Sequence, residues 1–104
     1  MGDPRAMNAE SLQRTVVVRN PQGLHLRPAD LLVKQASRYS SNVHIGREGQ
    51  MADCKSILSI LTLGAAQGTE LHLTAEGADA AQAIHAIAEL FDHGFFELEQ
   101  SDVE

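Results

Sequence analysis

The short segment of residues 23–28 carries the side chains best suited to chemistry, in the order Gly-Leu-His-Leu-Arg-Pro. The imidazole of His25 can act as a nucleophile and form a covalent intermediate, and the guanidinium of Arg27 can present a planar fork to phosphate oxygens. Pro28 suits the first turn of a helix, whose backbone N–H groups and positive dipole end favour an anion. These are the requirements of a histidine that accepts a phosphoryl group and hands it on. From spacing alone, a polar loop histidine beside a helix start is the more common case.

A helix that begins near Pro28 would position these groups. Apolar residues recur at steps of three, four and three, and they predict a helix over residues 28–39 with one buried stripe. The residues of this stripe are Ala29, Leu32, Ala36 and Tyr39. Asp30 would place a negative charge near the positive end of the helix dipole. Before the helix, the β-branched run 15–18 predicts a strand, and the Asn-Pro-Gln-Gly sequence 20–23 predicts a turn.

Two further helices are predicted downstream. Ser56 can act as the N-cap of a short helix that ends at Gly64. Asp79, with Gln82 three residues later, resembles a capping box at the start of the last helix, which Gly94 would end. The short helix contains Ile57, Ile60 and Leu61, and the inward stripe of the last helix consists of Ala80, Ile84, Ile87 and Phe91.

Three further strands, near residues 43–45, 50–53 and 69–75, complete the order β-α-β-β-α-β-α. The strand at 69–75 alternates between apolar and polar residues, so one of its faces is in contact with water. This alternation is typical of an antiparallel sheet that is covered on one side. The predicted fold class is therefore α+β, with a four-stranded antiparallel sheet and the helices on one face.

The length of 104 residues predicts one globular domain. We expect it to span residues 14–97, between a flexible N-terminal tail of residues 1–13 and an acidic C-terminal tail of residues 98–104. No apolar run is long enough for a transmembrane helix, and the polar first residues argue against a secretory signal. The single Cys54 allows no disulfide within one chain and suits a reducing cytoplasm, so we expect a cytoplasmic protein. We also expect a monomer.

The formal net charge of −6 hides an asymmetry. All eight Lys and Arg residues lie within positions 1–55, beside five acidic residues, whereas positions 56–104 hold nine acidic residues and no Lys or Arg. The first part therefore carries a charge of +3 and the second a charge of −9. A nucleic-acid-binding protein would have a denser basic face, so nucleic acid is not an expected partner. An acidic protein surface or a phosphate is a better match for the first part.

Two segments together resemble a known family. The sequence 23–29, Gly-Leu-His-Leu-Arg-Pro-Ala, is similar to the active-site signature of HPr, the histidine-containing phosphocarrier family of the phosphoenolpyruvate-dependent phosphotransferase system. The sequence 55–64, Lys-Ser-Ile-Leu-Ser-Ile-Leu-Thr-Leu-Gly, is similar to the family's regulatory-serine segment and lies at the family's separation from the histidine. Residues 68–71 and 75–80 follow the family's pattern for the last strand and helix. The resemblance covers residues 14–93.

The resemblance implies an open-faced sandwich of four antiparallel strands and three helices, in agreement with the order predicted from the residues. It also implies that His25 accepts the phosphoryl group on Nδ1 and that Arg27 steadies the phosphate. The donor would be phosphorylated enzyme I, and the acceptor would be a sugar-specific or regulatory protein of the system. The protein would be a covalent relay rather than an independent enzyme, because no second acid, base or metal site accompanies His25. No cofactor and no metal ion are expected.

The resemblance makes Ser56 the target of an ATP-dependent HPr kinase/phosphorylase. Phosphate there would add nearly two negative charges at a helix N-terminus, which tolerates them, so partners would be affected more than the fold. N-capping alone, worth about 1 kcal/mol, also accounts for Ser56, and the two roles can coexist. An alternative to phosphate relay is a regulatory binding module that Ser56 phosphorylation controls without sugar transport.

A modestly basic surface beside His25 is expected to dock protein partners. The residues assigned to it are Lys34, Arg38, Lys55, Leu58 and Leu61. Core packing is an equally good explanation for Leu58, Leu61 and Leu63. Insertion into a membrane is not expected.

Other residues that could do chemistry have ordinary explanations. His44, His72, His85 and His93 are expected to face solvent, because none is paired with a Cys or a carboxylate at a recognised ligand spacing. Cys54 is expected to be a small, partly buried residue rather than a reactive thiol. The Gly-Ala-Ala-Gln-Gly-Thr sequence 64–69 lacks the Lys and the length of a phosphate-binding P-loop.

Overall fold

The computed structural model describes residues 11–96. Within them, strands and helices follow one another in the predicted order β-α-β-β-α-β-α. The strands are β1 (Ser11–Val17), β2 (Asn42–Arg47), β3 (Gln50–Asp53) and β4 (Glu70–Glu76). The helices are α2 (Leu26–Ala36), α3 (Ile57–Leu61) and α4 (Ala80–Asp92), followed by the 3-10 helix η1 (Gly94–Phe96). None of these helices is long and apolar enough to cross a membrane.

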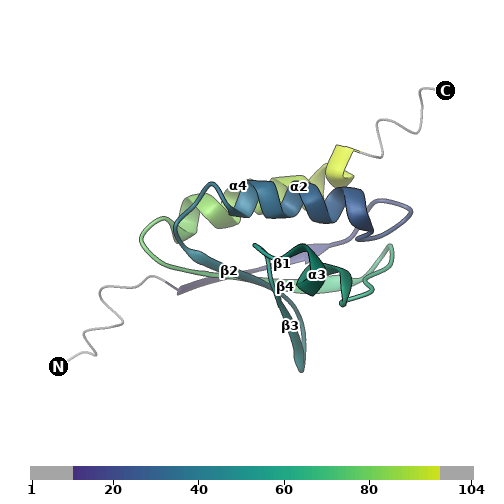
Figure 1. Cartoon of the computed structure of the whole chain (residues 1–104), viewed down its shortest axis with the longest axis horizontal. Coiled ribbons are helices and arrows are strands. Elements are labelled where there is room, and N and C mark those ends of the chain that lie inside the picture. Colours follow the sequence, from purple (N-terminus) through teal and green to yellow (C-terminus); the bar gives the residue numbers. More distant parts are fainter. Residues whose placement is uncertain (1–10, 97–104) are drawn as a thin grey trace.

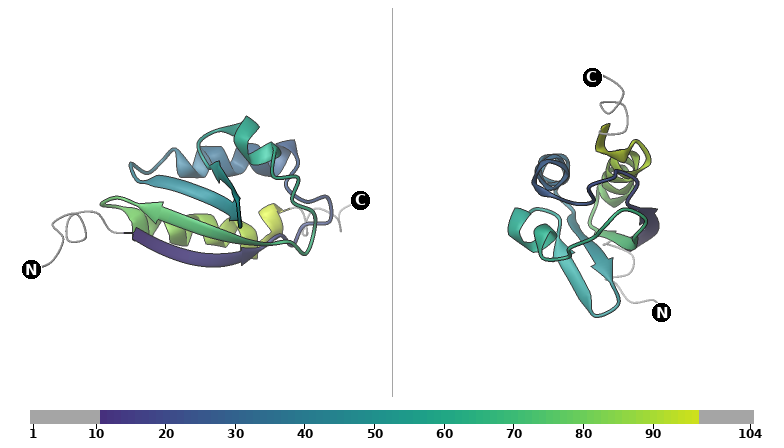
Figure 2. Two further views of the ribbon diagram at one scale, coloured as in Figure 1. Left: turned by 90° about the horizontal axis from the view of Figure 1, so that it is seen from below. Right: turned by 90° about the vertical axis from the view of Figure 1, so that its right-hand side faces the viewer.

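The sheet has the strand order β1-β4-β2-β3, and all of its neighbouring strands are antiparallel. The helices α2 and α4 run side by side over one face of it (Figure 1). The views in Figure 2 show the helices gathered on this one side, while no described helix covers the opposite face. The predicted α+β open-faced sandwich is therefore confirmed.

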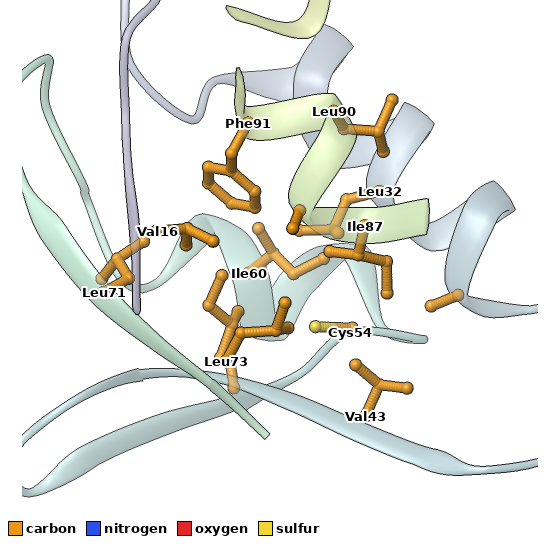
Figure 3. Close-up of a cluster of buried hydrophobic side chains, with 14 of the residues drawn as sticks. Val16, Leu32, Val43, Cys54, Ile60, Leu71, Leu73, Ile87, Leu90 and Phe91 are labelled. Carbon is orange, nitrogen blue, oxygen red and sulfur yellow. The ribbon is translucent and has the colours of Figure 1, made fainter. Parts of the chain in front are cut away.

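Apolar side chains fill the space between the covered sheet face and the helices (Figure 3). Leu71 and Leu73 of β4 belong to the same core cluster as Leu32 of α2, Ile60 of α3 and Ile87 of α4, and all five are fully buried. Burying one such side chain contributes about 2 kcal/mol. The alternation that predicted β4 as a half-exposed strand therefore arises because every second residue faces this common core.

α2 begins two residues earlier than predicted and ends three residues earlier. His25 takes the N-cap position, so Pro28 is the third helical residue and still lies in the first turn, where its missing N–H costs nothing. Asp30 consequently lies beyond the first turn, and its carboxylate pairs with Lys34 at 3.0 Å instead of facing the dipole. Tyr39 lies in the turn after the helix, yet it still packs against the core.

β1 begins at Ser11, so the expected N-terminal tail of residues 1–13 is too long by three residues. The first residues of β1 pair with residues 74–76 of β4. They are exposed and mostly polar, and it is this pairing with a distant strand that makes them extended. Residues 1–10 of the expected N-terminal tail and the expected acidic tail of residues 98–104 lie outside the described residues.

The predicted capping box of Asp79 and Gln82 is wrong. Asp79 occupies the N-cap position of α4, but its side chain makes no capping hydrogen bond. Its carboxylate instead accepts hydrogen bonds from the backbone N–H groups of Ser40 and Ser41, each at 2.9 Å, and from both of their hydroxyls. These bonds tie the turn after α2 to the start of α4. They lower the pKa of Asp79 to about 2, and the bond from the Ser41 hydroxyl has the largest effect.

Asp79→Asn is expected to destabilise the protein at neutral pH but not in strong acid. The folded carboxyl has a lower pKa than its ordinary value of 3.8, so its hydrogen bonds stabilise the fold above pH 3.8 and cease to do so as the pH falls to about 2. Thermal unfolding of the wild type and the variant should therefore differ most at pH 7 and converge near pH 2. Glu48→Gln, in the exposed β2–β3 turn, is the matched control. A difference between wild type and Asp79→Asn that is as large at pH 2 as at pH 7 would contradict this account.

Candidate functional site

His25 stands at the N-cap of α2 with an extended backbone, at φ −86° and ψ −168°. Its N–H donates to the Gly23 carbonyl at 2.9 Å, and its carbonyl accepts from the Ala29 N–H at 3.0 Å. Both backbone groups therefore serve to form the turn into the helix. The residue itself is half-buried. This position places an imidazole at the positive end of the α2 dipole.

The first turn of α2 offers backbone donors next to His25. The amides of Leu26 and Arg27 belong to the N–H groups that a helix leaves without an internal partner at its start, and Pro28 has no N–H. No acidic side chain lies in this first turn, and Arg27 is exposed. The imidazole of His25 is therefore followed by two backbone amides, the positive end of the α2 dipole and the guanidinium of Arg27. Together these groups can bind a phosphate.

A close approach of two backbone segments holds the loop before His25. The Leu24 N–H donates to the Ala65 carbonyl at 2.9 Å. Gly23 has a φ of +74° and lies so near Ala65 that a Cβ at this position would overlap the same carbonyl oxygen. The buried amide of Asn20 donates to the Gly23 carbonyl at 2.6 Å. Position 23 thus requires glycine, both because of its positive φ and because the backbone of Ala65 lies so close.

Ser56 is the N-cap of α3, as predicted. Its Oγ accepts a hydrogen bond from the Ser59 N–H at 3.3 Å. Beside it, the Lys55 Nζ donates to the Tyr39 carbonyl at 2.8 Å, and this bond ties the start of α3 to the turn after α2. The Lys55 ammonium is therefore engaged in holding the fold. α3 lies next to α2 (Figures 1 and 2), so the two motifs share one side of the molecule although they are distant in the sequence.

The other expected docking residues differ in how far they are exposed. Lys34 and Arg38 are exposed cations on and just after α2. Leu58 is 75% exposed on α3, whereas Leu61 is half-buried against the core. Leu63 is a core residue. Core packing therefore accounts for Leu63. A role in docking stays a prediction for Lys34, Arg38, Leu58 and Leu61, and Leu58 is the most exposed apolar residue among them.

Leu26 was not among the expected docking residues, yet it is 62% exposed in the first turn of α2. It lies directly between His25 and Arg27 in the sequence. The sequence contains one indication that Leu26 is exposed. It is an apolar residue at the start of a helix, but it does not belong to the predicted buried stripe of that helix. The structure therefore adds a second exposed leucine, besides Leu58, on the side of the molecule that carries His25.

The remaining histidines and Cys54 have the surroundings of ordinary structural residues, with one correction. His44, His72, His85 and His93 are exposed, as expected. The described residues contain no group of three or more His, Cys, Asp or Glu that could hold a metal ion. Cys54 is fully buried rather than partly buried. Burial, and then the charge of Asp53, raise the pKa of its thiol, so the thiol stays protonated and unreactive at neutral pH.

Comparison with known proteins agrees with this geometry. Residues 12–93 match the family model described as "PTS HPr component phosphorylation site". The chain is 40% identical to the Phosphocarrier protein HPr of Treponema pallidum, over 81% of this chain and 96% of that protein. It is 35% identical to the Multiphosphoryl transfer protein of Haemophilus influenzae over 86% of this chain, but it spans only 18% of that longer protein. The crystal structure of HPr-C-His from Thermoanaerobacter tengcongensis has a TM-score of 0.78 at 38% identity, with 82% of this chain and 96% of that chain covered.

The matched residues include both the loop that carries His25 and the segment that begins with Ser56. The similar solved structure also shares the arrangement of strands and helices described above. The chain therefore belongs to the HPr family of phosphocarrier proteins of the phosphotransferase system.

Proposed function

We propose that the protein accepts a phosphoryl group from phosphorylated enzyme I on His25 and passes it to downstream proteins of the phosphotransferase system. The observation that carries the proposal is the place of His25 at the N-cap of α2, beside backbone amides and the exposed Arg27. A phosphate bound there would meet hydrogen-bond donors and the positive end of a helix dipole. Membership of the family supports the class of reaction, and this position supports the choice of residue.

In the proposed step, the lone pair of the neutral His25 Nδ1 attacks the phosphorus atom of the donor. A bond between nitrogen and phosphorus forms, and the bond from phosphorus to the donor breaks, leaving its electron pair on the donor. The amides of Leu26 and Arg27 and the guanidinium of Arg27 would compensate the negative charge that arrives with the phosphoryl group. In the transfer to the acceptor, a nucleophile of the acceptor attacks the same phosphorus atom, the bond between nitrogen and phosphorus breaks, and its electron pair returns to Nδ1 of His25. The chain would thus be a covalent intermediate rather than an independent enzyme.

The proposed partners are enzyme I and sugar-specific or regulatory proteins of the system, in the cytoplasm. Exposed apolar and basic side chains on α2, in the turn after it and on α3 support docking of proteins on the side of His25. They are Leu26, Lys34, Arg38 and Leu58. Such a mixed surface suits a short-lived contact, because it buries some apolar area while charges orient the partners.

Ser56 is proposed as a regulatory site for an ATP-dependent HPr kinase/phosphorylase. Its oxygen already accepts the Ser59 N–H at the start of α3, and a phosphate there could accept the same donor. Because α3 lies beside α2, the added charge would appear on the side of the molecule that carries His25. An acidic partner surface would then be repelled. The alternative, a regulatory module without phosphate relay, would use Ser56 alone.

His25→Ala is expected to abolish acid-labile phosphorylation by phosphoenolpyruvate and a cognate enzyme I, because the variant lacks the nucleophilic nitrogen. The measurement is incorporation of labelled phosphate into the full chain. His72→Ala, which removes an exposed imidazole from β4, is the matched control and should be labelled like the wild type. Labelling that survives in His25→Ala would refute the assignment of the acceptor.

Arg27→Ala is expected to slow phosphorylation of His25 by about tenfold or more, since it removes a charged donor from the place where negative charge arrives. Folding should be unaffected, because Arg27 is exposed. Initial rates from rapid-quench experiments would measure the effect. Arg27→Lys keeps the charge but not the planar fork, so its rate should lie between those of the wild type and Arg27→Ala. Arg14→Ala on β1 is the matched exposed control. Equal rates in the wild type and Arg27→Ala would show that the guanidinium plays no part.

Ser56→Ala is expected to lose the acid-stable phosphate that ATP and an HPr kinase introduce. It should also lower the free energy of unfolding by about 1 kcal/mol, because α3 loses its N-cap. Ser59→Ala keeps the backbone groups of the cap and should match the wild type in both labelling and urea unfolding. Ser56→Asp should restore the stability without the labelling.

The two labelling experiments together separate the two candidate functions. A wild type that takes phosphate at His25 from phosphoenolpyruvate, but none from ATP, would support the carrier and refute the regulatory site. The reverse pattern would favour the regulatory module.

A further inference from the structure

The β2–β3 hairpin holds the segment after α3 through two side chains. Arg47 and Gln50 are cross-strand partners at the end of this hairpin. The Arg47 Nη2 donates to the Leu63 carbonyl at 2.7 Å, and the Gln50 Nε2 donates to the Thr62 carbonyl at 3.0 Å. Both acceptors follow the last turn of α3, where carbonyls lack helical partners. The bond from Arg47 is half-buried and carries a full charge, which makes it the stronger of the two.

The segment held in this way leads directly to the loop that carries His25. Leu63 is buried, and two residues later the Ala65 carbonyl accepts the Leu24 N–H at 2.9 Å. Gly23 packs against the same carbonyl with no room for a side chain. His25 follows immediately. Because packed segments shift together rather than deform independently, a displacement of the Leu63 carbonyl would be passed on to the turn into α2.

The far end of the same loop is anchored without Arg47. The Gly68 N–H donates to the Val18 carbonyl at 2.7 Å, and the Val18 N–H donates to the Thr69 carbonyl at 2.9 Å. These two bonds join the loop to the residue that follows β1. Loss of the Arg47 hydrogen bond should therefore loosen the near end of the loop, at Ala65, and leave the far end in place.

We propose that Arg47 is a positioning residue for His25. Its guanidinium fixes the Leu63 carbonyl, and through the Ala65 carbonyl it holds the loop that sets the imidazole at the start of α2. Arg47 acts through the backbone, as a donor to the Leu63 carbonyl in the neighbouring segment. The inference rests on the proposed function, because it takes His25 as the phosphoryl acceptor.

Amide hydrogen exchange in the full chain is the first test. In Arg47→Met, which keeps the apolar stem and removes the donor, the Leu24 amide should exchange about tenfold faster. The amides of Val18 and Ile87 should exchange as in the wild type, since their bonds do not involve the near end of the loop. Arg47→Lys keeps a charged donor and should restore part of the protection. Arg14→Met on β1 is the matched control with an exposed arginine and should leave all three amides unchanged.

The rate of His25 phosphorylation by phosphoenolpyruvate and enzyme I is the second test. Arg47→Met should lower the rate at saturating enzyme I about tenfold, with an unchanged KM for enzyme I, because a misplaced nucleophile slows the chemical step rather than docking. Arg47→Lys should recover part of the rate. A purely structural role would lower the melting temperature and leave the rate of the folded protein unchanged.

Faster exchange confined to Leu24, together with slower phosphorylation, would support the positioning role. Unchanged exchange at Leu24, or equally faster exchange at Leu24, Val18 and Ile87, would overturn it. A wild type that takes no phosphate would refute the proposed function and the positioning role with it. A wild type and an Arg47→Met variant that are phosphorylated at equal rates would refute the positioning role alone.

Discussion

The hydrogen bond from the Leu24 N–H to the Ala65 carbonyl joins the loop before α2 to the loop after α3. His25 is the next residue along the chain, so this crossing of two backbones sets where the imidazole enters the helix. The contact exists only because Gly23 has no side chain to separate the two segments and can adopt a positive φ. Gly23 thus serves the packing of these two segments, while His25 and Arg27 are the residues proposed to carry the chemistry.

The other end of α2 is also held by hydrogen bonds from distant segments. In the turn after the helix, the Tyr39 carbonyl accepts a hydrogen bond from the Lys55 ammonium. The backbone N–H groups of Ser40 and Ser41 in the same turn donate to the Asp79 carboxylate. α2 is therefore fixed between α3 and the start of α4 before any partner arrives. If His25 is the phosphoryl acceptor, as proposed, its place on a helix held at both ends would require little reorganisation when a donor docks, and this would lower the cost of binding.

Much of the fold could be predicted from residue order, because alternation in β4 and the apolar stripe of α2 reflect one shared core. The placing of His25 at the start of a helix could also be predicted locally, because Pro28 suits a first helical turn. The choice of His25 as phosphoryl acceptor came from the resemblance to the family. The errors were of another kind. The first residues of β1 are extended by their pairing with β4, and Asp79 has two serines within reach that compete with its own helix. Neither is visible in a local window of sequence.

The sequence by itself determined the order of the elements, the placing of His25 and Arg27 at a helix start and the capping of α3 by Ser56, because each depends on neighbours a few residues away. Only the tertiary structure decided which distant acceptors and donors the charged groups of Lys55, Arg47 and Asp79 meet. Lys55 reaches Tyr39, Arg47 reaches Leu63 and Asp79 reaches Ser41 across the fold. A charged group can form a hydrogen bond with any suitable backbone group that comes within about 3 Å of it. Which group this is depends on how the sheet and its helices bring distant segments together.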